Sequence, residues 1–301
     1  MSTPLTPLPR ESFAGYDEGP LPPAAAADPD NPRWGVATAF GVWLASLALM
    51  LFFPLVAVVP YVFFYYRGQD FARAAEALAK DPTALLIGIA ATLPIHLATL
   101  AVVWAVATGF GKRPFWEAVG WSWPPRVSPL VGILLCVLAA ILLLVGASVL
   151  AHLLGVNKTP FDEMLESSSG ALFATAFLAT ATAPLVEELV YRGMLYPALR
   201  RLAGAAFAVL VVTFLFALVH YWQYKNSPGT IAAILLLSFS LTVVRAWTGR
   251  VLPCFVIHLV FNGVQVIGLL YSHFRPESEP QQKAAARALY ELLTHSATLF
   301  F

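Results

Sequence analysis

Long apolar segments, each of the length needed to cross a lipid bilayer, recur along this chain of 301 residues. A bilayer core of about 30 Å requires about 20 apolar residues in a helix, whose backbone hydrogen bonds are then satisfied within the segment. The segments are Gly35–Tyr66, Thr83–Phe110, Leu130–Leu154, Ala171–Tyr196, Ala205–Tyr221, Thr230–Thr248 and Val251–Tyr271. The sequence therefore predicts an all-α polytopic membrane protein, a bundle of about seven to eight transmembrane helices.

The composition agrees with this fold class and excludes others. Hydrophobic residues make up 59% of the chain and charged residues 12%, and the mean hydropathy is +0.73, unlike an ordinary soluble domain. A net charge of +1 provides no concentrated basic face for nucleic acid. The two cysteines, Cys136 and Cys254, lie in apolar segments, which argues against a disulfide framework. We expect a multi-pass protein of the cell membrane, with the lipid bilayer as a partner.

The chain divides into a transmembrane domain and two tails. Residues 1–33 contain eight of the 23 prolines and no apolar signal sequence, which predicts a disordered Pro-rich tail. Residues 34–272 form the predicted transmembrane helical domain, and residues 273–301 a C-terminal tail that is partly helical. In the first link, Phe71–Lys80 has the pattern of an amphipathic helix at the membrane surface. The links on the two sides carry nearly equal numbers of Lys and Arg, so orientation is left open.

Two adjacent glutamates and an arginine interrupt the apolar run Ala171–Leu199. Charged side chains at bilayer depth cost at least a few kcal/mol unless they are paired or wetted by a cavity, so they indicate a functional site. Glu188 and Arg192 are four residues apart and share a helical face, whereas Glu187 is displaced by about 100°. Two interpretations follow: a purely structural ion-pair cluster, or an orienting Glu188–Arg192 pair that leaves Glu187 to face a reactant.

Three further polar residues lie in neighbouring segments, His220 in the fifth and His258 with Asn262 in the seventh. The spacing of four places the His258 imidazole and the Asn262 amide on one helical face. With a rise of about 1.5 Å per residue, Glu187, His220 and Asn262 come to roughly 18–24 Å from the same membrane face, and His258 to roughly 12 Å. We therefore expect these side chains to line one intramembrane cavity.

Such a cavity has the groups needed for amide hydrolysis. A carboxylate with two imidazoles can accept a proton from water, or can hold a metal ion with an open position for water. A neighbouring amide can donate to a developing oxyanion. Other hydrolytic and nucleotide-dependent classes lack their signatures, because the chain contains no HExxH, GxSxG or Walker A sequence.

The same residues carry a resemblance to a known family. The stretch from Glu187-Glu188 to Arg192 resembles an EExxxR motif, Phe216 with His220 resembles FxxxH, and His258 with Asn262 resembles HxxxN. In this order, inside helices, they are similar to the CPBP family of intramembrane proteases. That family includes the type II CAAX-prenyl proteases and bacteriocin-processing or immunity proteins. The resemblance covers about residues 171–270, and Arg250 departs from it, because a serine is common at that position.

The resemblance implies a role for each residue. Glu187 and His220 would activate water, His258 and Asn262 would stabilise the oxyanion, and Glu188 with Arg192 would hold the first glutamate's helix. The metal is left open: Glu187, His220 and His258 would be the ligands of a Zn²⁺ ion, or the mechanism would be metal-free. The implied substrate is a membrane-associated peptide or protein, and nothing in the sequence shows that it is prenylated.

Two other functions fit part of the pattern. A non-proteolytic scaffold or immunity protein would retain the fold and bind a peptide or protein partner without cutting it. A proton-coupled carrier would use buried Glu, Arg and His as a relay, but matched Gly/Pro-broken helices in two halves are missing. Of the remaining polar residues, we expect Arg245 to extend to the membrane interface and His96 to serve helix packing or interfacial anchoring. Tyr191 is expected in an aromatic belt at the membrane surface, with a place beside a substrate groove as the alternative.

Overall fold

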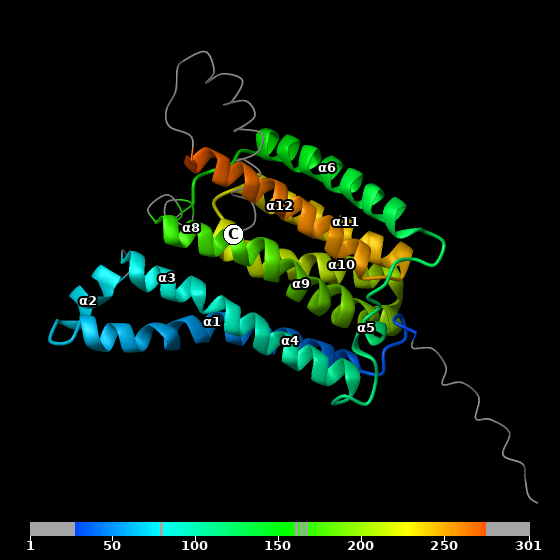
Figure 1. Cartoon of the computed structure of the whole chain (residues 1–301), viewed down its shortest axis with the longest axis horizontal. Coiled ribbons are helices and arrows are strands. Elements are labelled where there is room, and N and C mark those ends of the chain that lie inside the picture. The colour runs from blue at the N-terminus through cyan, green and yellow to red at the C-terminus, as the bar shows by residue number, and fades with distance from the viewer. Residues whose placement is uncertain (1–27, 79–80, 160–161, 163–164, 166–167, 275–301) are drawn as a thin grey trace, which may run out of the picture.

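The computed structural model describes residues 28–274, apart from 79–80, 160–161, 163–164 and 166–167 (Figure 1). These residues form helices and connecting loops, with no strand among them. The N-terminal half contains α1 (Val36–Tyr65), α2 (Phe71–Leu78), α3 (Pro82–Ala90), α4 (Thr92–Thr108), α5 (Phe115–Ala118) and α6 (Pro129–Leu154). The C-terminal half contains α8 (Ser169–Phe177), the π-helix η1 (Leu178–Thr182), α9 (Ala183–Glu188), the π-helix η2 (Leu189–Leu195), α10 (Tyr196–Tyr224), α11 (Pro228–Thr248) and α12 (Leu252–Phe274).

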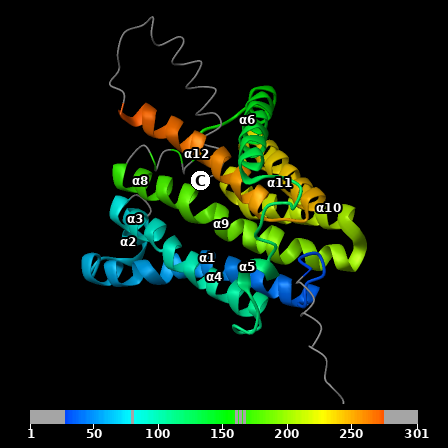
Figure 2. The same ribbon diagram turned by 45° about the vertical axis from the view of Figure 1, so that its right-hand side comes forward.

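The helices are arranged in layers. In Figures 1 and 2, α1, α3 and α4 form one side of the bundle and α6 lies on the opposite side. The continuous run from α8 to η2, together with α10, lies between them. Helix α11 packs against both α10 and α6, and α12 packs against α6 and η1. The run that carries the two glutamates is therefore covered by helices on both sides.

Six helical segments in the described part of the chain are long and apolar enough to cross a membrane. The longest, Ser169–Tyr224, has 56 residues, or about 84 Å at 1.5 Å per residue, far more than one bilayer crossing. It is interrupted at Ala203 and Gly204, where Gly204 adopts a φ of 85° that an L-residue would rarely adopt. This segment thus covers two of the predicted helices, and the protein is a multi-pass integral membrane protein of the predicted all-α class.

Helix α1 is one continuous element of 30 residues, although Pro54 and Pro60 lie inside it. Its C-terminal end is joined to α3 through Asp81, which caps α3 and accepts hydrogen bonds from Tyr61 and Tyr66, each at 2.7 Å. The Tyr66 hydroxyl, followed by Tyr61 and the backbone amides of the cap, lowers the pKa of Asp81 to about 2. The predicted amphipathic segment forms α2 in the same connection.

The last residues of the predicted N-terminal tail contact the bundle. Arg201 donates to the backbone oxygens of Pro32 and Trp34, and the Trp34 indole donates to the oxygen of Met194 at 3.1 Å. Asp30 forms ion pairs with two arginines of the bundle. We call residues 28–34 the strap. Most of both predicted tails, residues 1–27 and 275–301, lies outside the described residues, so their state stays a prediction.

Candidate active site

A π-turn followed by a proline shapes the helix that carries the glutamates. A proline inside a helix lacks an N–H and clashes with the carbonyl four residues earlier, and a wider turn relieves that clash. In η1, the Ala183 amide donates to the oxygen of Leu178, five residues back. The Ala179 oxygen therefore loses Ala183 as a donor, and the next residue that a π-turn would offer is Pro184. It instead accepts a hydrogen bond from Asn262 Nδ2 of α12 at 3.1 Å.

The same arrangement recurs at the end of η2. The Tyr196 amide donates to the oxygen of Tyr191, and the following residue is Pro197. The Arg192 oxygen is consequently left without a helical donor, and it accepts a hydrogen bond from Arg245 Nε of α11 at 3.1 Å. Each π-turn thus releases one backbone carbonyl, and each carbonyl binds a side chain from another transmembrane helix.

Glu188 is the buried centre of the site. One of its oxygens, Oε1, accepts hydrogen bonds from Arg192 at 3.0 Å and from His258 Nδ1 at 2.9 Å, and all three side chains are essentially inaccessible. The predicted Glu188–Arg192 pair is confirmed. The bond to His258 was not predicted, and it means that Glu188 also orients an imidazole on a different helix. No partner of Oε2 is found among the described residues.

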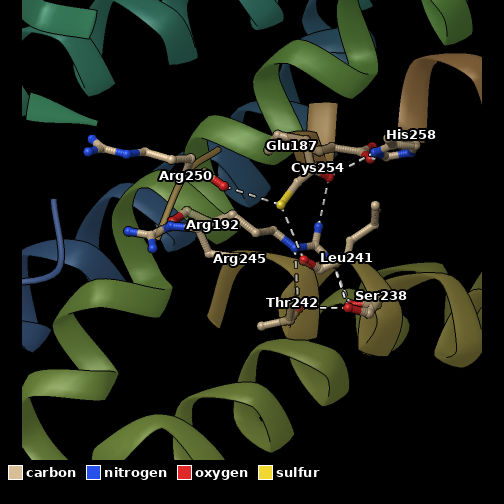
Figure 3. Close-up of polar contacts among 10 residues, drawn as sticks. Glu187, Arg192, Ser238, Leu241, Thr242, Arg245, Arg250, Cys254 and His258 are labelled. Atoms are coloured by element: carbon tan, nitrogen blue, oxygen red, sulfur yellow. Dashed lines mark hydrogen bonds and ion pairs between the residues drawn. The ribbon is translucent and has the colours of Figure 1, made fainter. Parts of the chain in front are cut away.

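Arg192 is held on several sides by α10 and α11. Its guanidinium donates to the oxygen and the hydroxyl of Ser238 at 3.0 and 2.9 Å, and to the hydroxyl of Thr242 at 3.3 Å (Figure 3). The Phe216 ring lies 5.0 Å from the guanidinium carbon, a cation–π contact. A buried charged group is stable only when its hydrogen-bond donors have partners. These contacts hold Arg192 in place, and Arg192 in turn fixes the position of Glu188.

Glu187 occupies a different environment from its neighbour. Its side chain is 27% exposed, and its Oε2 lies 3.7 Å from His258 Nε2. That distance is longer than a direct hydrogen bond. His258 Nδ1 faces the Glu188 carboxylate and Nε2 faces Glu187, so each nitrogen of the ring has a carboxylate as its neighbour. The predicted division between a braced Glu188 and an accessible Glu187 is present in the structure.

His220 lies near the same place on α10. Its Nδ1 donates to the oxygen of Phe216 at 2.8 Å, so its Nε2 is the nitrogen left to act. The Phe216 ring is a neighbour of both imidazoles, with its centroid 4.9 Å from that of His220 and 6.2 Å from that of His258. Within the described part of the chain, no hydrogen bond joins His220 directly to Glu187, so these two groups can cooperate only through an intervening molecule.

Asn262 lies one turn beyond His258 on α12, next to the η1 helix. Its Nδ2 binds the Ala179 oxygen, while its Oδ1 is buried without a partner among the described residues. Gln265 lies on the same face of α12, and its Oε1 is likewise buried without a partner among the described residues. The sequence did not single out Gln265, although its spacing of three from Asn262 places it on the predicted polar face.

Some residues near the site were missed or misjudged from the sequence. Arg245 does not extend to the interface as expected: it is fully buried and binds the Arg192 oxygen and Asp30. Its position in an apolar run was the same signal that identified Arg192. Tyr191 is buried and accepts a hydrogen bond from the Trp43 indole, and His96 binds Thr182 at 2.8 Å. His96 thus helps to pack the site, as expected, whereas Tyr191 is buried beside the site and does not lie in an aromatic belt.

The proposed zinc ligands fit only in part. The donor types are suitable, since His220 and His258 each have Nδ1 engaged and Nε2 available, and Glu188 supports His258 as outer carboxylates support ligating histidines. However, no three His, Cys, Asp or Glu side chains in the described ranges are grouped closely enough to share one ion. We therefore derive no chemical step through a metal.

Comparison with known families agrees with this geometry. Residues 169–264 match the sequence model of the type II CAAX prenyl endopeptidase Rce1-like family. The match covers about a third of the chain and includes α8 to α11 and the part of α12 that bears His258 and Asn262. No match was found among curated proteins or among solved structures. The chain thus carries a region similar to the Rce1-like family, which agrees with the resemblance of its motifs to the CPBP family of intramembrane proteases.

Proposed function

We propose that this protein is an intramembrane endopeptidase that hydrolyses a peptide bond of a membrane-associated peptide or protein. The observation that carries the proposal is the asymmetric glutamate pair. Glu188 is buried and binds Arg192 and His258, whereas Glu187 is accessible beside the unengaged nitrogen of His258. A fixed imidazole next to an accessible carboxylate is the arrangement that general-base catalysis needs.

In the first step, a water molecule bound between Glu187 and His220 loses a proton to the Glu187 carboxylate. The resulting hydroxide attacks the carbonyl carbon of the scissile bond and forms a tetrahedral oxyanion. His220 orients the water through Nε2, because its Nδ1 is held by the Phe216 oxygen. When the tetrahedral intermediate collapses, Glu187 returns the proton to the leaving amine nitrogen, so the enzyme regains its initial state.

His258 and Asn262 stabilise the tetrahedral oxyanion by donating hydrogen bonds to it. His258 takes up its second proton from solvent before the reaction and keeps it throughout, so it donates through Nδ1 to Glu188 and through Nε2 toward the substrate. Asn262 Nδ2 has a second hydrogen beyond the one it donates to Ala179. Glu188 and Arg192 act on this step indirectly, by fixing the His258 ring. Donors that are oriented before the reaction stabilise the developing charge without a reorganisation cost.

The test uses the full chain in liposomes with two probe peptides. One ends in a farnesylated CAAX sequence, and the other has the same sequence without the prenyl group and is anchored by an N-terminal palmitoyl chain. We expect the parent to cleave at least one of them, and Glu187→Gln to lower kcat about 10²–10⁴-fold. The exposed Glu117 on α5 provides the matched control, since Glu117→Gln makes the same change away from the site.

The comparison of the two peptides also separates possible substrate classes. Cleavage of the farnesylated peptide alone assigns the protein to prenylated chains, and cleavage of both assigns it to membrane-anchored peptides in general. A parent protein that cuts neither peptide contradicts the proposal, and so does a Glu187→Gln variant that cuts as fast as the parent. Thermal unfolding of each variant shows whether the fold is retained.

A further inference from the structure

The carboxylate of Asp30, in the strap, contacts Arg245, which in turn binds the backbone of Arg192 in the site. Asp30 Oδ1 lies 2.7 Å from Arg245 Nη1, and its Oδ2 pairs with Arg200. The same Arg245 guanidinium donates to the Pro29 oxygen at 3.2 Å and, through Nε, to the Arg192 oxygen at 3.1 Å. One side chain therefore connects the strap to the residue that holds Glu188.

The backbone around this contact is shaped to receive the strap. A Cβ atom on Gly120 would lie 2.9 Å from the Cβ of Pro29, which a real side chain does not tolerate. A Cβ on Gly249, whose φ is 68°, would lie 3.6 Å from Asp30 Oδ2. Gly120 thus leaves room for Pro29, whereas Gly249 is required by its own positive φ and lies at ordinary contact distance from Asp30.

Charge balance shows what Asp30 does for the site. Glu188, Arg192 and Arg245 are all fully buried, so this cluster of three side chains holds two guanidinium groups and one carboxylate. Isolated buried charges are very costly, and each requires a counterion. Asp30, whose side chain is 25% exposed, supplies the second negative charge from the edge of the bundle. Because Asp30 pairs with Arg245, the Glu188 carboxylate is available to bind Arg192 and His258.

We propose that Asp30 is a positioning residue for the catalytic site, acting through Arg245. This inference rests on the proposed function and adds a residue to it. Asp30 lies outside the region 169–264 that matches the protease family. Without Asp30, Arg245 remains buried and lacks a counterion. The buried carboxylate of the same cluster is Glu188, whose Oε2 has no partner among the described residues. Arg245 then competes for Glu188, and the His258 ring loses its fixed orientation.

The experiment compares Asp30→Asn with variants that disturb the strap in other ways. We expect Asp30→Asn to lower kcat about tenfold with KM nearly unchanged, since the residue contacts no substrate. Asp30→Glu, which keeps the charge, should restore most of kcat. The matched control is Arg201→Gln, which removes hydrogen bonds to Pro32 and Trp34 but leaves Asp30 and Arg245 paired. It should leave kcat within about twofold of the parent.

A double variant tests the charge balance itself. Asp30→Asn with Arg245→Gln removes both members of the pair, so it should retain more activity than Asp30→Asn alone. Equal losses in Asp30→Asn and Arg201→Gln would mean that the strap acts only as a structural anchor, and would overturn the inference. So would strictly additive losses in the double variant, or an Asp30→Asn variant with the parent's kcat.

A spectroscopic readout separates this inference from the proposed function. The ¹⁵N signals of His258, assigned by their loss in His258→Gln, report whether Nδ1 is still hydrogen-bonded to Glu188. We expect them to shift in Asp30→Asn and to stay unchanged in Arg201→Gln. If the parent cleaves no probe, the proposed function fails, but this comparison still decides whether Asp30 positions His258. Unchanged His258 signals in Asp30→Asn would overturn the inference.

Discussion

The Nδ1 atom of His258 lies 2.9 Å from Oε1 of Glu188, and the two residues come from helices separated by 70 positions in the chain. The same oxygen accepts a hydrogen bond from Arg192. Glu188 is therefore shared between a cation on its own helix and an imidazole on α12. This sharing explains why two adjacent glutamates are present, because one carboxylate builds the site and the other remains accessible within it.

The two glutamates should differ in their effect on stability. Glu188→Gln leaves the buried Arg192 without its counterion, which we expect to destabilise the protein by about 3–5 kcal/mol. Glu187→Gln changes a partly exposed group and should leave the thermal unfolding temperature nearly unchanged while activity is lost. Unfolding of the two purified variants in the same detergent measures this difference. Equal unfolding temperatures would show that Glu188 is not the structural member of the pair.

Pro184 should matter because it leaves the Ala179 oxygen free for Asn262. Pro184→Ala restores an N–H that competes for that oxygen, so the Asn262 side chain loses its anchor and activity should fall about tenfold. The effect should not add to that of Asn262→Ala, because both changes break the same contact. A comparable proline far from the site provides the control, since Pro60→Ala in α1 should leave kcat unchanged. Additive losses at Pro184 and Asn262 would refute this account.

Asp81 should make the connection between α1 and α3 sensitive to acid. Its folded pKa of about 2 is below the unfolded value of about 3.9, so the carboxylate stabilises the folded state fully above about pH 4. This contribution should decline as the pH falls from about 4 to about 2. Asp81→Asn should be less stable than the parent at neutral pH, and the difference should shrink across that window. Thermal unfolding of both proteins as a function of pH measures it, and a constant difference would contradict the assignment.

The donor spacing also leads to an expectation about metal dependence. Because no three suitable side chains are grouped among the described residues, we expect cleavage to survive dialysis against a chelator. The purified active protein should contain well below one equivalent of zinc by elemental analysis. Loss of activity on chelation, restored by stoichiometric Zn²⁺, would instead show that Glu187, His220 and His258 close around an ion.

The sequence was sufficient for the fold class and for one contact of the candidate site, the Glu188–Arg192 pair. Apolar runs of bilayer length predict spanning helices because the membrane leaves few other backbone solutions. Charged side chains are costly to bury in a membrane, so Glu188 and Arg192 stand out in an apolar run as candidates for a functional site. Their spacing of four predicted a pair, which the structure contains. Arg245 carried the same signal but was assigned to the interface, because a long side chain near a helix end can reach water or turn inward.

Which side chains meet across helices was decided only by the tertiary structure. The bonds from Asn262 to Ala179 and from Arg245 to Arg192 require carbonyls that a regular α-helix would use internally, and local sequence does not reveal the π-turns that release them. The contact between Asp30 and Arg245 joins residues 215 positions apart, so no periodicity could show it. The sequence by itself determined which groups are costly to bury; packing decided which partner each one has, because a buried charge is stable only where another helix or the strap brings its counterion.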